Sequence, residues 1–198
     1  MEDLETIELI IDEETDFSGI QAISVVERPA IEEDFIFLKS DKKKINLAEV
    51  DSERKILMGA ALIPDKKIYR RDVNGKEYNI FFTKDTVVRA SQLFLMKGKQ
   101  NNSTLEHEID IEGLSVVESW IIEDEVHDKS RKFGLEMPLG TWMVSVKVHN
   151  DMIWDEFVKT KKVKGFSIEG FFVDKLSNND EEEVAASEAL DIIKNLIG

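Results

Sequence analysis

The residues best suited to catalysis are a serine, a histidine and a glutamate on predicted strands. Ser167 stands between the bulky apolar side chains of Phe166 and Ile168, in a stretch bracketed by Gly165 and Gly170. Side chains alternate along a strand, so Phe166 and Ile168 share one face while Ser167 points to the other. A serine held on a stiff element with space above it can act as a nucleophile, although a structural serine in a strand is the commoner case.

The histidine and the glutamate come from a predicted hairpin that turns at Glu112-Gly113. If this hairpin closes on two residues, residue 111 pairs with 114 and residue 107 pairs with 118. His107 and Glu118 are then the only ionisable side chains on an apolar face, with Cβ atoms about 5 Å apart. A carboxylate beside an imidazole fixes its tautomer and stabilises the imidazolium, as in a nucleophilic triad. The alternatives are a satisfied buried pair, or a slipped register that turns Glu118 to water.

The composition limits the classes of function. The chain has 198 residues and a formal net charge of −15, which argues against nucleic-acid binding because most of the surface would repel phosphate. It has no cysteine, so disulfides, thiolate metal ligands and cysteine nucleophiles are excluded. No apolar run approaches the roughly 20 residues that a membrane-spanning helix requires, and the acidic start differs from a secretory signal. Neither a cofactor nor a membrane partner is expected.

The periodicity predicts a mainly β, α+β fold of about seven strands with two or three helices. Asn74-Gly75 between two strand-like runs is a strong hairpin signal, and residues 84–96 show helical spacing after a potential N-cap at Thr83. We expect a closed or partly open antiparallel β-barrel with flanking helices. It occupies residues 54–176, after an acidic N-terminal extension and linker at 1–53 and before an amphipathic C-terminal helix at 177–198.

Several short segments carry a resemblance to a known family. The chain resembles the XkdF-like serine proteases of tailed phages over roughly residues 54–175. Each motif is short, but their order and spacing together are hard to obtain by chance. The segments are Ile63-Pro64-Asp65-Lys66, Tyr69-Arg70, Leu105-Glu106-His107, Val117-Glu118-Ser119-Trp120, Gly140-Thr141-Trp142-Met143 and Gly165-Phe166-Ser167-Ile168-Glu169-Gly170.

The resemblance implies both a fold and an activity. The family belongs with the phage prohead maturation proteases, which share a β-barrel fold with herpesvirus assembly proteases. It implies a serine endopeptidase in the host cytoplasm, inside the immature capsid, that cuts scaffold and capsid proteins and often itself. Ser167 is then the nucleophile and His107 the general base. The third residue differs among relatives, so Glu118 rests on the strand pairing. Glu169 is its rival, about 6.5–7 Å from Ser167 on the same strand face.

Two other functions remain open. The same barrel could serve as a non-catalytic scaffold or docking module in capsid assembly, with the C-terminal helix binding a partner. A metal-dependent hydrolase could use His107, His127 or His149 with carboxylates, although these histidines lack the tight spacing of a metal site. Self-association is also left open.

Overall fold

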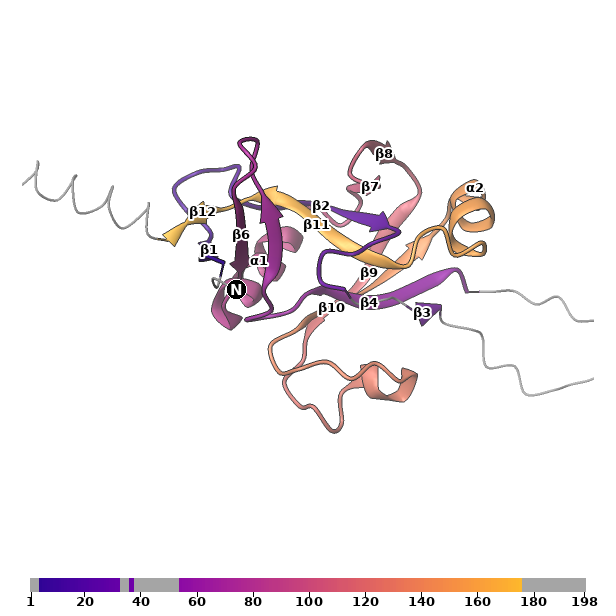
Figure 1. Cartoon of the computed structure of the whole chain (residues 1–198). Helices are drawn as coiled ribbons and strands as arrows, with labels where there is room; N and C mark the ends of the chain where they lie inside the picture. Colours follow the sequence, from indigo (N-terminus) through magenta and orange to yellow (C-terminus); the bar gives the residue numbers. More distant parts are fainter. Residues whose placement is uncertain (1–3, 33–35, 38–53, 176–198) are drawn as a thin grey trace, which may run out of the picture.

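The strands form three separate sheets rather than a barrel. The computed structural model describes residues 4–32, 36–37 and 54–175. Within these residues the four-stranded sheets have the orders β12-β1-β6-β5, β3-β4-β10-β9 and β11-β2-β7-β8 (Figure 1). None of them closes on itself, so the fold is mostly β as predicted but the predicted β-barrel is wrong.

The N-terminal strands explain this difference. β1 lies between β12 and β6, and β2 lies between β11 and β7, so both enter the middle of a sheet. Their pairings with β6 and β7 are parallel, which an antiparallel barrel of consecutive strands does not contain. The strand bounds are β1 Thr6–Ile10, β2 Gly19–Val26, β3 Ile36–Phe37, β4 Ile56–Leu62, β5 Ile68–Arg71, β6 Glu77–Phe81, β7 Ser103–Leu105, β8 Ile109–Ile111, β9 Leu114–Ile121, β10 Trp142–Val148, β11 Gly165–Phe171 and β12 Val173–Asp174.

Local signals in the sequence predicted several elements correctly. Helix α1 spans Lys84–Met96, and the hydroxyl of its N-cap Thr83 accepts a hydrogen bond from the Thr86 N–H. β5 and β6 form the hairpin predicted at Asn74-Gly75, where Gly75 has a φ of 85°. The remaining helical elements are short. They are η1 Lys129–Phe133, α2 Asp151–Ile153 and the π-helical turn η2 Trp154–Val158.

The sheet β11-β2-β7-β8 separates an apolar face from a polar one. In the antiparallel register of β11 and β2, Phe166 pairs with Val25 and Ile168 pairs with Ile23. Phe166, Val25 and Ile23 are each at most 2% exposed and belong to the hydrophobic core. The intervening residues of both strands therefore face away from this core, and Ser167 is one of them.

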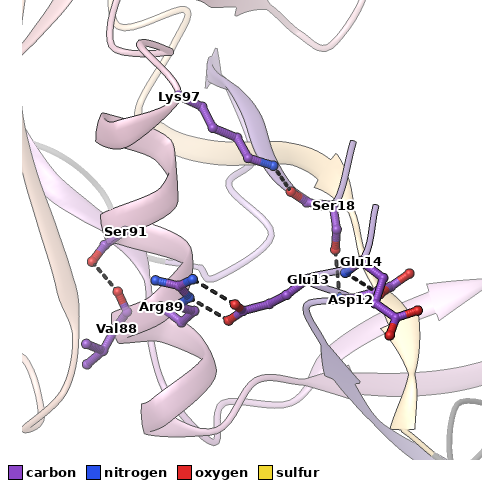
Figure 2. Close-up of polar contacts among 8 residues, drawn as sticks. All are labelled: Asp12, Glu13, Glu14, Ser18, Val88, Arg89, Ser91 and Lys97. Carbon is purple, nitrogen blue, oxygen red and sulfur yellow. Dashed lines mark hydrogen bonds and ion pairs between the residues drawn. The ribbon is translucent and has the colours of Figure 1, made fainter. Parts of the chain in front are cut away.

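Helix α1 is fastened to the loop between β1 and β2 (Figure 2). Arg89 donates two hydrogen bonds to the Glu13 carboxylate, Nε to Oε1 at 2.6 Å and Nη2 to Oε2 at 2.8 Å. The Lys97 ammonium donates to the carbonyl oxygens of Asp16 at 2.8 Å and Ser18 at 3.0 Å. These contacts fix the chain immediately before β2, which is the central strand between β11 and β7.

Part of the predicted domain organisation falls outside the described residues. The linker up to residue 53 and the amphipathic helix at 177–198 belong to segments that the structure does not describe. Residues 6–10 and 19–26 of the predicted N-terminal extension form β1 and β2, which pair with strands from later in the chain and so share sheets with the rest of the fold. In the described part of the chain, no helix has the length and apolar character needed to cross a membrane.

Candidate active site

Ser167 lies on β11, which forms one edge of its sheet. The residue directly across on β2 is Ser24, and Ser24 lies across from Thr104 on the parallel strand β7. Ser167 is 6% exposed and Ser24 is fully buried. The three hydroxyl residues therefore form a row across the non-core face of the sheet, because direct cross-strand partners share a face.

His107 is held over this row by an unusual turn. β7 does not continue into a long strand; it reverses at residues 106–108 and pairs back with β8. Glu106 and His107 both have left-handed backbone conformations, with φ of 54° and 60°. Such conformations are costly for residues other than glycine and persist where the surroundings impose them.

Hydrogen bonds to β2 impose this turn. The Glu106 N–H donates to the Val25 carbonyl at 3.2 Å, and the Glu106 carboxylate accepts from the Glu27 N–H at 2.7 Å. The His107 N–H donates to Ser24 Oγ at 3.1 Å, while the Ser24 hydroxyl lies 3.3 Å from the Thr104 carbonyl and donates to it. Ser24 therefore links the backbone of His107 to the strand beside Ser167.

Glu169 is the carboxylate that contacts the histidine ring. Its Oε1 lies 3.0 Å from His107 Nδ1 and also accepts a hydrogen bond from the Thr104 hydroxyl. Glu169 follows Ser167 by two residues on β11, so the two side chains share a face and their Cα atoms are about 6.5–7 Å apart. Nδ1 faces Glu169, and among the described residues no hydrogen bond occupies the other ring nitrogen, Nε2, which can therefore serve a neighbouring group.

Glu118 does not take the place predicted for it. β9 pairs with β10, where Glu118 lies across from Ser145, and β8 pairs with β7 instead of with β9. The Glu118 carboxylate accepts a hydrogen bond from the Lys129 ammonium, which lowers its pKa. The predicted pairing of His107 with Glu118 is wrong because the chain already reverses at residues 106–108, before the turn that the sequence predicted at Glu112-Gly113.

The serine and the histidine are both connected to the same sheet face, through Ser24 and Glu169, but not to each other. Among the described residues, no hydrogen bond joins the Ser167 hydroxyl to the His107 ring. Catalytic hydrogen bonds are often long or misaligned in the absence of substrate. The arrangement contains a half-exposed imidazole oriented by a carboxylate, with a serine on the same sheet face, and this combination can support nucleophilic acyl transfer.

His127, one of the two other histidines considered for metal binding, has a local partner. His127 Nδ1 lies 2.9 Å from Asp124 Oδ2, three residues earlier. Hydrogen bonds from the His127 side chain, and from the backbone N–H groups of His127 and Val126, lower the pKa of Asp124 to about 2. In the described segments no group of three or more histidine, aspartate or glutamate side chains is arranged to hold a metal ion.

Ser24 and Thr104 were missed by the sequence analysis. Ser24 had a usable signal, since it stands between Ile23 and Val25 in the same way that Ser167 stands between Phe166 and Ile168. Two such patterns in one chain are compatible with two strands that pair directly, and this is their arrangement here.

Comparison with known proteins gives one match. A family model described as "Putative phage serine protease XkdF" matches residues 44–175. This range contains Ser167, His107, Glu118 and Glu169 but begins after β2, which carries Ser24. No curated protein and no solved structure matches the chain.

Proposed function

We propose, from the premise that this chain belongs to the phage serine protease XkdF family, that it is an endopeptidase of capsid maturation. Its substrates in this proposal are scaffold and capsid proteins inside the prohead, and the chain also cuts itself. The catalytic residues are Ser167, His107 and Glu169. Glu169 replaces Glu118 as the third residue, because Glu169 is the carboxylate within hydrogen-bond distance of the histidine ring.

In the proposed reaction, the Ser167 oxygen attacks the scissile carbonyl carbon while His107 Nε2 accepts the hydroxyl proton. The resulting imidazolium donates that proton to the leaving amine as the peptide C–N bond breaks. Water then attacks the acyl-serine ester, again giving a proton to Nε2, which returns it to the Ser167 oxygen. Glu169 holds the ring with Nδ1–H toward its carboxylate and stabilises the imidazolium.

The observation that supports this proposal is the hydrogen bond between His107 Nδ1 and Glu169 Oε1, formed on the sheet face that also carries Ser167. The strained turn adds support, because residues other than glycine that have a left-handed backbone conformation concentrate at functional sites. The two features are independent: one concerns the side chain of His107 and the other its backbone.

The direct experiment is co-expression of the full chain with the scaffold and capsid proteins of the same phage. We expect the wild-type chain to process them and Ser167→Ala to leave them uncut, with an unchanged melting temperature. Mass spectrometry of the capsid proteins identifies the cleavage products. Processing by Ser167→Ala at the wild-type rate would refute Ser167 as the nucleophile.

A second candidate function is a non-catalytic assembly module. It is favoured by the low exposure of Ser167, at 6%, and by the lack of a hydrogen bond from its hydroxyl to the His107 ring. A fluorophosphonate probe added to assembled proheads separates the two functions. Labelling of Ser167 supports the protease, whereas proheads that mature with neither labelling nor cleavage support the module.

A further inference from the structure

A small cavity lies beside the strand that carries Ser167. It has a volume of about 210 Å³, and Ser167 contributes to its wall. Most of its lining is apolar, including Leu62, Ile80 and Phe82, each of which is at most 8% exposed. The single charged side chain in the wall is Arg70 on β5.

Arg70 is placed inward without a compensating anion. It lies two residues from Ile68, which is 3% exposed, and so shares the core-facing side of β5. Its Nη1 donates to the carbonyl of the adjacent Tyr69 at 2.9 Å, and within the described ranges no carboxylate pairs with its guanidinium. Burial lowers the pKa of Arg70. A partly buried cation without an anion is unfavourable, so a ligand carboxylate at this position would be bound favourably.

A wider groove of about 660 Å³ meets the cavity at Arg70 and Ala30. Its cationic side chains outnumber its carboxylates, which is unusual for a chain with a net charge of −15. The cations are Arg28, Lys67, Arg70 and Lys164, and the carboxylates are Glu27 and Glu32. The groove is therefore a locally positive surface that attracts anionic segments.

One wall residue of the groove is hydrogen-bonded to the turn that holds the proposed base. Glu27, at its wall, donates its backbone N–H to the carboxylate of Glu106, the residue before His107. Lys164, at the wall as well, immediately precedes β11. The groove wall is therefore hydrogen-bonded to the residue before His107, and it adjoins the start of the strand that carries Ser167.

We propose that this groove binds an acidic segment of the substrate polypeptide, with one substrate carboxylate on Arg70 and apolar substrate groups in the adjoining cavity. The inference rests on the proposed function, because it assigns the groove to the same substrate. A polypeptide fits better than a nucleic acid, since the cavity beyond Arg70 is apolar and most of the protein surface repels phosphate.

The test measures binding without cleavage, using the full-length chain with Ser167→Ala. The probes are a fluorescein-labelled peptide rich in glutamate and leucine, and a second peptide of equal length with glutamine for every glutamate. Fluorescence anisotropy gives the dissociation constants. We expect the glutamate peptide to bind more tightly, and Arg70→Gln to weaken its binding about tenfold or more through loss of a charge-assisted contact.

Arg71→Gln is the matched control. It removes the same charge from the next residue of β5, but Arg71 is exposed and lies on the opposite face of the strand. We expect this variant to bind the glutamate peptide within about twofold of the parent. We also expect Arg70→Gln to melt no lower than the parent, because it removes a partly buried charge that lacks an anion.

Several results would overturn the inference. They are equal binding of the two peptides, equal losses in the two arginine variants, a lower melting temperature for Arg70→Gln with unchanged binding, or tighter binding of a single-stranded oligonucleotide than of the glutamate peptide. The assay is independent of the proposed chemistry. Peptide binding through Arg70 by a chain that never cleaves would refute the protease alone, whereas scaffold cleavage that is indifferent to Arg70→Gln would refute this inference alone.

Discussion

The Nδ1 atom of His107 lies 3.0 Å from Oε1 of Glu169, although Glu169 is on β11, His107 follows β7, and strand β2 lies between β11 and β7. The Glu169 side chain is about one-third exposed, at 31%, and the histidine side chain is 42% exposed. The pair is therefore accessible to a substrate. The Thr104 hydroxyl donates a hydrogen bond to the same Oε1 and so helps to orient the Glu169 carboxylate. A structural pair in the core would have no need of this exposure.

The first prediction concerns the two rival carboxylates. Glu169→Gln preserves the shape of the side chain but removes the charge that orients His107 and stabilises its imidazolium. We expect cleavage of the scaffold protein to fall by about a hundredfold or more. Glu118→Gln is the control, because Glu118 lies on another sheet and forms an ion pair with Lys129. We expect this variant to cleave at close to the wild-type rate. The measurement is kcat/KM for the purified chains.

The reverse order, with Glu118→Gln the more damaged, would restore the assignment made from the sequence. Equal, small losses of kcat/KM in both variants would mean that neither carboxylate orients His107 during catalysis and that water takes this role.

The second prediction concerns Ser24, which we regard as a positioning residue. Ser24→Ala removes the acceptor of the His107 N–H and the donor to the Thr104 carbonyl, in a fully buried place. The bond to the Thr104 carbonyl is buried and the bond from the His107 N–H is partly buried, and leaving a buried polar group without its partner costs about 1–3 kcal/mol. We expect a lower melting temperature and a reduced kcat with a smaller change in KM, because the ring is misplaced while the groove is intact.

Ser130→Ala is the matched control for Ser24→Ala. Ser130 is also fully buried, but its hydroxyl has no hydrogen-bond partner in the part of the chain that the structure describes, so its removal is expected to leave stability and kcat unchanged or to raise stability slightly. If Ser24→Ala lowers the melting temperature without lowering kcat, then Ser24 supports the sheet alone.

The local elements could be predicted because their signals are local. The cap at Thr83, the turn at Asn74-Gly75 and the alternation around Ser167 each depend on a few neighbouring residues, and all three match the structure. The pairing of β2 between β11 and β7 could not be predicted in this way. It joins residues far apart in the chain, and the similar patterns around Ser24 and Ser167 do not by themselves specify that β11 and β7 are the neighbours of β2.

The error over Glu118 has a more specific cause. The sequence at residues 105–109 alternates like a continuous strand and contains no glycine, asparagine or proline to mark a turn. The reversal at Glu106 and His107 is imposed by hydrogen bonds to β2, a tertiary effect that overrides the local pattern. The roles of Ser167 and His107 stay predictions, and the carboxylate beside the histidine could not be chosen from the sequence because its position depends on this turn.

The third prediction concerns pH and lies outside the proposed site. The hydrogen bonds from His127 and Val126 lower the pKa of Asp124 to about 2, below the value of about 3.9 for an unfolded chain. A depressed folded-state pKa contributes stability above the unfolded pKa, and this contribution is lost as the pH falls from about 4 toward 2. We therefore expect Asp124→Asn to melt below the wild type at neutral pH.

The difference in melting temperature between wild type and Asp124→Asn is expected to shrink as the pH approaches 2. An NMR titration of the Asp124 carboxyl provides a direct check. A midpoint near 4 would show that the contacts with His127 and Val126 do not persist in solution.

The fourth prediction concerns Gly170, which follows Glu169 at an irregularity in the pairing of β11 with β2. A Cβ atom at this position would lie 2.4 Å from the carbonyl oxygen of Gly19 and 2.9 Å from the Cα of Ile20, so Gly170→Ala must push the two strands apart. We expect a loss of about 1–3 kcal/mol in the free energy of unfolding, by denaturant titration. We also expect a fall in kcat, because the displaced strand carries Glu169.

Gly98→Ala is the control for Gly170→Ala. The left-handed conformation of Gly98, with a φ of 68°, makes alanine unfavourable there too, but no atom of the described residues lies within 4 Å of the added Cβ. A comparable fall in kcat for both variants would mean that general destabilisation, and not the position of Glu169, limits the activity.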